Sequence, residues 1–343
     1  MNNCSFDVTA SLGSYTQDTG YSGTVTQACE VTTSGDNTVV AGTLTGDATN
    51  PWNSGGDFAW ITGTISHYTL LLNMTGADKS IQYDGYGWLL SLRINENTTF
   101  TSANENYGLH CVKINIASGK TLTSVTGGFY TYDHFGALEI NNQGTIHAKW
   151  IKIWVMSPTS VNLGTLEVEA GEVLEINTTG SGILSLSANA VLSSVDVYSN
   201  HETNTMTLHT NGYNLSCAGA FELGTRGIID LGEGTHTFAD NFDGVGTGSD
   251  VIPGTSTCYF TGADKTIQLQ AADSFYRAYV TGTYTLASDI EVTKRMDVIG
   301  ALKKGAYSIT SPNGLIQEVI DTNYLNQPIN RNLNDEGVFG NIA

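Results

Sequence analysis

The sequence predicts an all-β protein, a right-handed parallel β-helix or β-solenoid with a short terminal cap and a C-terminal arm. Charged residues make up only 14% of the 343 residues, and 39 glycines stand beside 5 prolines, which is the composition of strands and turns. Short alternating runs recur through 161–239 and indicate short strands. The octapeptide TGADKSIQ (75–82) returns as TGADKTIQ (261–268), as expected of two similar corners in different coils.

A β-sandwich or barrel also contains many short strands. Its hairpins, however, should supply more tight Asn-Gly or Asp-Gly pairs and strands of more even length. Further pairs of similar motifs, such as ITGTI at 61–65 and VTGTY at 280–284, fit no single period. The repeat is therefore degenerate, which favours an irregular solenoid over one built from consensus repeats.

Three segments divide the chain. Residues 1–36 are predicted to cap the solenoid or attach it, because an uncovered coil end exposes core and strand edges. Residues 37–310 form the β-solenoid, and 311–343 a short helix and a C-terminal arm. The helix is predicted because the segment 313–325 has apolar residues at helical spacing, at Leu315, Ile316, Val319 and Ile320. The arm either reaches a neighbouring subunit or is disordered.

The charge of the chain excludes some functions. With 33 acidic against 14 basic residues the net charge is −19, so nucleic acid is a poor partner, since phosphate recognition needs clustered Lys and Arg. No apolar run is long enough for a membrane span, and we expect no membrane insertion. The start, MNNCSFDVTASLGS, lacks the features of a secretory signal. We therefore expect the chain to be made and released in a cytoplasm.

Metal and cofactor sites are not expected. The five cysteines are widely spaced and form no CxxC pair, which disfavours a zinc site or a disulfide framework. We interpret them as small buried residues in strands such as 108–116 and 256–262. The seven histidines are dispersed, and no calcium-loop or HExxH motif is present.

Two aromatic clusters are the better functional lead. They lie in QYDGYGWLL (82–90) and FYTYDHF (129–135). Sugars stack their C–H faces on aromatic rings while carboxylates and amides bind the hydroxyls. The predicted glycan-binding residues are Tyr83, Asp84, Tyr86, Trp88, Tyr132, Asp133 and His134. Aromatic packing inside the coil or at a seam between subunits remains the alternative.

Catalysis is not expected, although weak candidates exist. Glycan-cleaving enzymes use paired carboxylates, and Glu167 and Glu169 would share one face of a strand. The same spacing is also typical of a solvated strand face, and no motif fixes a reaction. The candidates are Asp133, Glu139, Glu167 and Glu169, with Glu172 and Glu175 further along the same row.

The segment WIKIWVM (150–156) alternates strictly, and both of its faces are largely apolar. Such a strand is covered on two sides. A subunit interface in a trimer would supply the second cover.

The amino-acid sequence of residues 206–238 and 256–268 resembles the Gly/Thr-rich repeats of phage and virus tail-fibre, tailspike and capsid-appendage proteins. The resemblance implies a structural virion protein, assembled in the host cytoplasm and exposed on the particle surface. It implies a homotrimer, contacts with other virion proteins and binding of a host-surface glycan. A polysaccharide-cleaving tailspike enzyme and a cellular β-solenoid adhesin are the alternatives.

Overall fold

The computed structural model describes residues 3–84, 87–103, 105–133, 138–311 and 315–318. Within these residues the chain contains strands and no helix. The strands pair in parallel and stack as a β-solenoid of about 14 turns. The prediction of a parallel β-solenoid is confirmed.

The chain divides into two compact units. Unit 1 comprises Met1–Trp154 and Val161–Leu174, and unit 2 comprises Val155–Ser160 and Glu175–Ala343. Two strands, β21 (Thr159–Val161) and β23 (Leu174–Thr178), contain residues of both.

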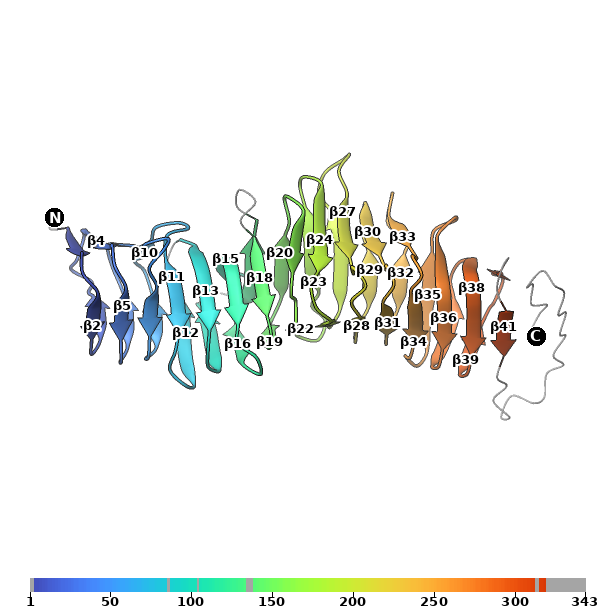
Figure 1. Ribbon diagram of the computed structural model, residues 1–343, viewed down its shortest axis with the longest axis horizontal. Helices are drawn as coiled ribbons and strands as arrows, with labels where there is room; N and C mark the ends of the chain where they lie inside the picture. The colour runs from blue at the N-terminus through green and yellow to red at the C-terminus, as the bar shows by residue number, and fades with distance from the viewer. Residues whose placement is uncertain (1–2, 85–86, 104, 134–137, 312–314, 319–343) are drawn as a thin grey trace. The chain divides into compact units, whose positions relative to one another are not determined.

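Unit 1 has three sheets, here called A, B and C. Figure 1 shows the sheet B strands following one another from β2 through β5, β11 and β13 to β15. Sheet A contains β1 (Cys4–Phe6), β4 (Thr24–Gln27), β7 (Thr43–Thr45) and β10 (Thr64–Ile65). Sheet B contains β2 (Ala10–Leu12), β5 (Val31–Thr33), β8 (Trp52–Ser54), β11 (Leu71–Met74), β13 (Leu89–Ile94), β15 (Gly108–Ile116), β17 (Gly128–Tyr132) and β20 (Ile151–Trp154), with β18 (Glu139–Asn142) paired to β15. Sheet C contains β3 (Tyr15–Gln17), β6 (Asn37–Val39), β9 (Phe58–Trp60), β12 (Lys79–Tyr83), β14 (Thr98–Ser102), β16 (Thr121–Thr126), β19 (Thr145–Ala148) and β22 (Thr165–Val168).

Unit 2 also has three sheets, here called D, E and F. Sheet D contains β24 (Gly182–Leu186), β27 (Met206–His209), β30 (Gly227–Asp230) and β33 (Asp250–Ile252). Sheet E contains β23, β26 (Val195–Ser199), β29 (Phe221–Leu223), β32 (Phe242–Gly244), β35 (Lys265–Leu269), β37 (Thr283–Leu286) and β39 (Ala301–Lys303). Sheet F contains β25 (Ala190–Leu192), β28 (Leu215–Cys217), β31 (Thr235–Phe238), β34 (Thr257–Phe260), β36 (Ser274–Val280), β38 (Ile290–Val298), β40 (Ile309–Thr310) and β41 (Leu315–Glu318).

Each strand alternates between the core and the outer face, because successive side chains of a strand point to opposite sides. In unit 1 the core holds large aromatic side chains that are at most 1% exposed, namely Trp52, Phe58, Trp60, Phe100 and Phe129. In unit 2 the buried rings of Phe221, Phe238, Phe242 and Phe260 contact one another across successive coils. Burial of these rings is the main driving force for stacking the coils.

The repeated octapeptide forms the same corner twice. Asp78 and Asp264 both adopt a left-handed conformation, with φ of 53° and 55°. The glycine of each copy lies against the preceding coil, since a Cβ on Gly76 or Gly262 would come within 2.0 or 2.3 Å of a backbone oxygen. This confirms the prediction of two similar corners and explains why glycine stands there.

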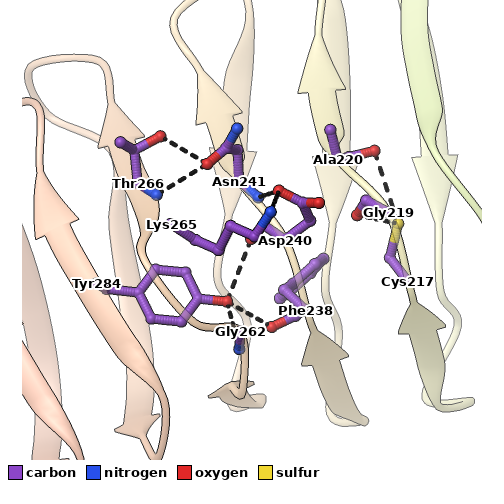
Figure 2. Close-up of polar contacts among 10 residues, drawn as sticks. All are labelled: Cys217, Gly219, Ala220, Phe238, Asp240, Asn241, Gly262, Lys265, Thr266 and Tyr284. Atoms are coloured by element: carbon purple, nitrogen blue, oxygen red, sulfur yellow. Dashed lines mark hydrogen bonds and ion pairs between the residues drawn. The ribbon is translucent and has the colours of Figure 1, made fainter. Parts of the chain in front are cut away.

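The two corners nevertheless lead in opposite directions. The first copy connects β11 of sheet B to β12 of sheet C, whereas the second connects β34 of sheet F to β35 of sheet E, and E and F are the unit 2 strands of the same 16-stranded sheets as B and C. Each strand start is held by a side chain of the preceding coil. Ser80 N–H donates to Asp57 Oδ1 at 2.8 Å, and Thr266 N–H donates to Asn241 Oδ1 at 2.9 Å. Figure 2 shows the second corner, where Lys265 also pairs with Asp240 at 2.9 Å.

The ends of the described chain continue the strand pattern. Within residues 1–36, strands β1 to β5 pair in register with the coils that follow. Residues 315–318, part of the segment expected to be helical, form strand β41 beside β38. Residues 319–343, which contain the rest of that segment and the expected arm, lie outside the described residues. The described residues include no helix with the length and hydrophobicity of a membrane span.

Three of the five cysteines, Cys111, Cys217 and Cys258, are buried as expected, whereas Cys4 is exposed and Cys29 half-buried, so the expectation is wrong for these two. Cys111 and Cys258, in the two strands named above, are 0% exposed, and burial raises the pKa of both thiols. All five cysteines are free thiols.

Candidate functional site

The outer face of sheet B in unit 1 carries a row of aromatic side chains. In this row, called the aromatic row below, successive residues come from successive coils: Tyr68, Trp88, His110 and Tyr130 form one column, and Tyr132 and Trp154 lie beside it. The strand register fixes the row, since β15 and β17 place His110 opposite Tyr130, and β17 and β20 place Tyr132 opposite Trp154.

The rings touch without a break. Centroid distances are 5.6 Å from Tyr68 to Trp88, 4.6 Å from Trp88 to His110 and 5.0 Å from His110 to Tyr130. Trp88 also contacts Tyr132 at 5.7 Å. These contacts are edge-to-face, an arrangement that the charge distribution of aromatic rings favours. The row is therefore a preformed, rigid surface rather than a set of independent side chains.

Tyr68 is held in an unusual backbone conformation at the start of the row. Its φ is 59°, a left-handed value that a bulky residue seldom adopts. Such strain persists only where the surroundings hold it, and it concentrates at functional sites. Its amide N–H donates to Trp88 O at 3.0 Å, so the backbone fixes the two residues together.

The row is uncharged at neutral pH. Burial lowers the pKa of His110 to about 4, so its imidazole stays neutral. The Nδ1 atom of His110 and the Nε1 atom of Trp154 are buried without a partner among the described residues. Aromatic rings lie on several sides of these two side chains. The faces of those rings are therefore the weak acceptors that remain for an N–H group of His110 or Trp154. A neutral, apolar surface of this kind suits the C–H faces of sugars.

Of the predicted residues in the first cluster, Trp88 lies at the centre of the row. Tyr83 belongs to sheet C and is only 7% exposed; it packs against Trp60 at 4.8 Å and donates to Gly87 O at 3.1 Å. Asp84 closes a turn, because its carboxylate accepts bonds from the Gln82 side chain and the Ala103 N–H. Tyr86 lies outside the described residues.

Of the second cluster, Tyr132 belongs to the row. Asp133 is 1% exposed, and its Oδ1 accepts a bond from Leu138 N–H at 3.3 Å, so its carboxylate already has a backbone partner. His134 lies outside the described residues. Among the predicted residues, the structure thus brings Trp88 and Tyr132 together.

The four weak catalytic candidates do not converge. Glu139 lies on β18 and pairs with Lys113 at 2.9 Å, next to sheet B. Glu167 lies on β22 of sheet C opposite His147, and Glu169 follows it as an exposed residue. Glu167 and Glu169 therefore lie on a solvated strand face.

A second feature, in unit 2, was not predicted as a group. It is a column of carboxylates on the outer face of sheet E, called the acid row below: Glu175, Asp196, Glu222 and Asp243. The pKa of Asp196 is raised to about 6, first by burial and then by Glu222 and Glu175, while Gly224 N–H opposes the shift. A carboxyl group that stays partly protonated near pH 6 has the property of a general acid.

Tyr198 and Asn177 complete the acid row at one end. The Tyr198 hydroxyl donates to Glu175 Oε2 at 2.5 Å and accepts a bond from Asn177 Nδ2 at 3.1 Å. Burial and the bond to Glu175 raise the pKa of Tyr198. Among the described residues no group of three or more metal-ligating side chains has the arrangement of a metal site.

One sequence signal points to Tyr68, His110 and Tyr130, the residues of the row's column that were not predicted as binding residues. Aromatic residues at 68, 88, 110 and 130 recur every 20 to 22 residues, close to the length of one coil.

Comparison with known proteins gives no further information on the site, because no protein-family model, curated protein or solved structure matches the chain.

Proposed function

We propose that this chain is a structural virion protein, a tail fibre, spike or capsid-mounted decoration, that binds a host-surface glycan through the aromatic row. The observation that carries the proposal is the unbroken contact of half-buried rings over successive coils of unit 1. The β-solenoid fold is compatible with such a role and also with a cellular adhesin.

The geometry suits a saccharide ligand. Neighbouring coils are about 4.8 Å apart in a parallel sheet, so the row offers apolar contacts at intervals close to the size of a sugar ring. The rings pack against one another before a ligand arrives. The side chains therefore lose little conformational entropy on binding, which favours non-covalent binding of a ligand.

We also propose that the chain forms a homotrimer with contacts to other virion proteins. Apolar side chains remain exposed in unit 1, such as Tyr107 at 63% and Val125 at 61%, and oligomer contacts cover surfaces of this kind. Trp150, expected at a subunit interface, lies against its own chain, because a Cβ on Gly128 would meet its ring at 2.0 Å. Sedimentation of the purified protein tests the trimer; a monomeric mass contradicts it.

The test of the binding site is Trp88→Ala. It removes the ring that contacts Tyr68, His110 and Tyr132, and we expect glycan binding and adsorption to host cells to fall about tenfold or more. The matched control is Tyr213→Ala, which removes a tyrosine that is 38% exposed in unit 2. Circular dichroism checks that both variants keep the strand content.

Equal binding by Trp88→Ala and the wild type would remove the aromatic row from consideration. The same samples are assayed for new reducing ends. We expect none, since the aromatic row has no catalytic carboxylate; cleavage that Asp196→Asn abolishes would instead assign an enzyme to the acid row.

A further inference from the structure

A polar hollow lies on the outer face of sheet B in unit 1, beside the aromatic row. Its volume is about 240 Å³. Leu71, Leu90 and Ile114 give it an apolar base. The polar groups that line it are Ser91, Arg93, Lys113, Asn115 and Glu139.

The hollow and the aromatic row share two strands. Arg93 of β13 follows Trp88, the residue directly before that strand, by five residues, and on β15 Lys113 follows His110 by three. At about 3.3 Å per residue these separations are at most about 16 and 10 Å. An oligosaccharide of a few sugars reaches from the rings to the hollow.

Two basic side chains face this hollow in a strongly acidic chain. The first basic residue of the sequence is Lys79, and the net charge is −19. Arg93 is exposed and forms no ion pair or side-chain hydrogen bond with another described residue. An exposed guanidinium presents a planar fork of donors that matches a carboxylate or a sulfate.

The carboxylates near the hollow already have partners. Glu139 pairs with Lys113 at 2.9 Å, with 62% of its side chain exposed. Asp47, next to the lining residue Ala48, accepts bonds from Thr49 and Asn50, which hold its pKa down to about 2. The positive charge of Arg93 therefore remains available to a ligand.

We propose that the hollow binds the anionic group of an acidic glycan whose neutral rings lie on the aromatic row. Arg93 forms the principal ion pair, Asn115 and Ser91 offer further hydrogen bonds, and Lys113 becomes a second cation when Glu139 releases it. This inference rests on the proposed glycan binding and specifies the ligand class.

Glu139 provides a test of opposite sign. It competes with the ligand for Lys113 and repels a negative charge in the hollow. Glu139→Gln should therefore strengthen the binding of acidic glycans several-fold, whereas Arg93→Gln should weaken it about tenfold. A structural role of either residue would not produce opposite effects that depend on ligand charge.

The experiment measures binding of full-length protein to matched probes. They are sialylated lactose with lactose, oligogalacturonate with its methyl ester, and sulfated lactose with lactose. The proteins are wild type, Arg93→Gln, Glu139→Gln and Trp88→Ala, each at low and high salt. We expect an acidic probe to bind better than its neutral match, and Arg93→Gln to lose that preference while keeping weak binding of the neutral match.

The outcomes separate the two proposals. Preference for the carboxylated or the sulfated probe identifies the anion, and both support the inference. Equal binding of acidic and neutral probes, or no effect of Arg93→Gln on the preference, overturns it and leaves the proposed function standing when Trp88→Ala abolishes binding. No binding to any probe overturns the acidic-glycan inference, and binding that Trp88→Ala leaves intact overturns the proposed function.

Discussion

Acid should weaken the aromatic row through His110. Burial lowers the pKa of this side chain from 6.5 to about 4, so the unfolded chain takes up a proton at a higher pH than the folded chain does. The contribution of His110 to the free energy of unfolding is therefore greatest above pH 6.5 and decreases as the pH falls toward 4. Because one pKa unit is worth about 1.4 kcal/mol, the loss between pH 7 and pH 5 is about 2 kcal/mol.

The variant that isolates this effect is His110→Phe. Phenylalanine keeps an aromatic ring between Trp88 and Tyr130 and removes the titrating group. The Nδ1 atom of His110 has no partner among the described residues, so its loss should cost little at neutral pH. We expect the variant to lose about 2 kcal/mol less stability than the wild type between pH 7 and pH 5.

Urea unfolding at several pH values, followed by circular dichroism and tryptophan fluorescence, measures this difference. Burial also lowers the pKa of His236, but that contribution is common to the wild type and the variant and cancels. The control His201→Phe removes a histidine from the surface of unit 2. Identical pH dependence of the wild type and His110→Phe would refute the reasoning, since His110 would then not contribute.

Two further substitutions test polar groups in unit 2. Tyr284→Phe removes the hydroxyl that donates to Phe238 O at 2.9 Å and accepts from Gly262 N–H at 3.0 Å. We expect a loss of about 1 to 3 kcal/mol of unfolding free energy, measured by urea denaturation; a loss below 0.5 kcal/mol would contradict a structural role for this hydroxyl. Burial, and then the bonded Asp250, raises the pKa of Asp273 to about 7, so its stabilising protonated form is lost as the pH rises through 7. Asp273→Asn should be more stable than the wild type at pH 8 and gain less at pH 5, and thermal unfolding of both proteins at both values checks this; a difference between the two proteins that is the same at pH 5 and pH 8 would be inconsistent with it.

Local features of the fold could be predicted from the sequence because they depend on short-range chemistry. The octapeptide encodes a corner by itself: a glycine close to the preceding coil, an aspartate in a left-handed conformation and a hydroxyl residue that starts a strand. What it does not encode is the direction in which it joins the two long sheets, since the first copy leads from β11 to β12 and the second from β34 to β35. Residues 315–318 show the same limit, since helical spacing of apolar residues was overridden by pairing with β38.

The candidate site could be predicted only in part. Trp88 and Tyr132 lie in obvious aromatic clusters, but Tyr83, five residues before Trp88, belongs to another sheet and is buried. Tyr68 and His110 stand outside the clusters. His110 joins the row through the strand register, and Tyr68 joins it from a turn whose backbone bonds to Trp88. Coil lengths vary, because β13 and β15 pair with an offset of 22 residues, whereas β15 and β17 pair with one of 20. Register sets the row, and register is a long-range property that no local pattern records.

Repulsion between neighbouring carboxylates destabilises the acid row, whereas a column of asparagines elsewhere in this chain avoids such repulsion. In unit 1, amides in successive coils bond to one another, Asn73 to Asn53 and Asn95 to Asn73, both at 2.7 Å. Amides can do this because each both donates and accepts, whereas ionised carboxylates only accept and repel their neighbours. Glu222→Gln should therefore lower the pKa of Asp196 and raise stability at neutral pH by a few tenths to about 1 kcal/mol, since Glu222 is exposed and screened by solvent. Titration of Asp196 by NMR measures the shift; a pKa that stays near 6 would exclude Glu222 as a cause and leave burial and Glu175.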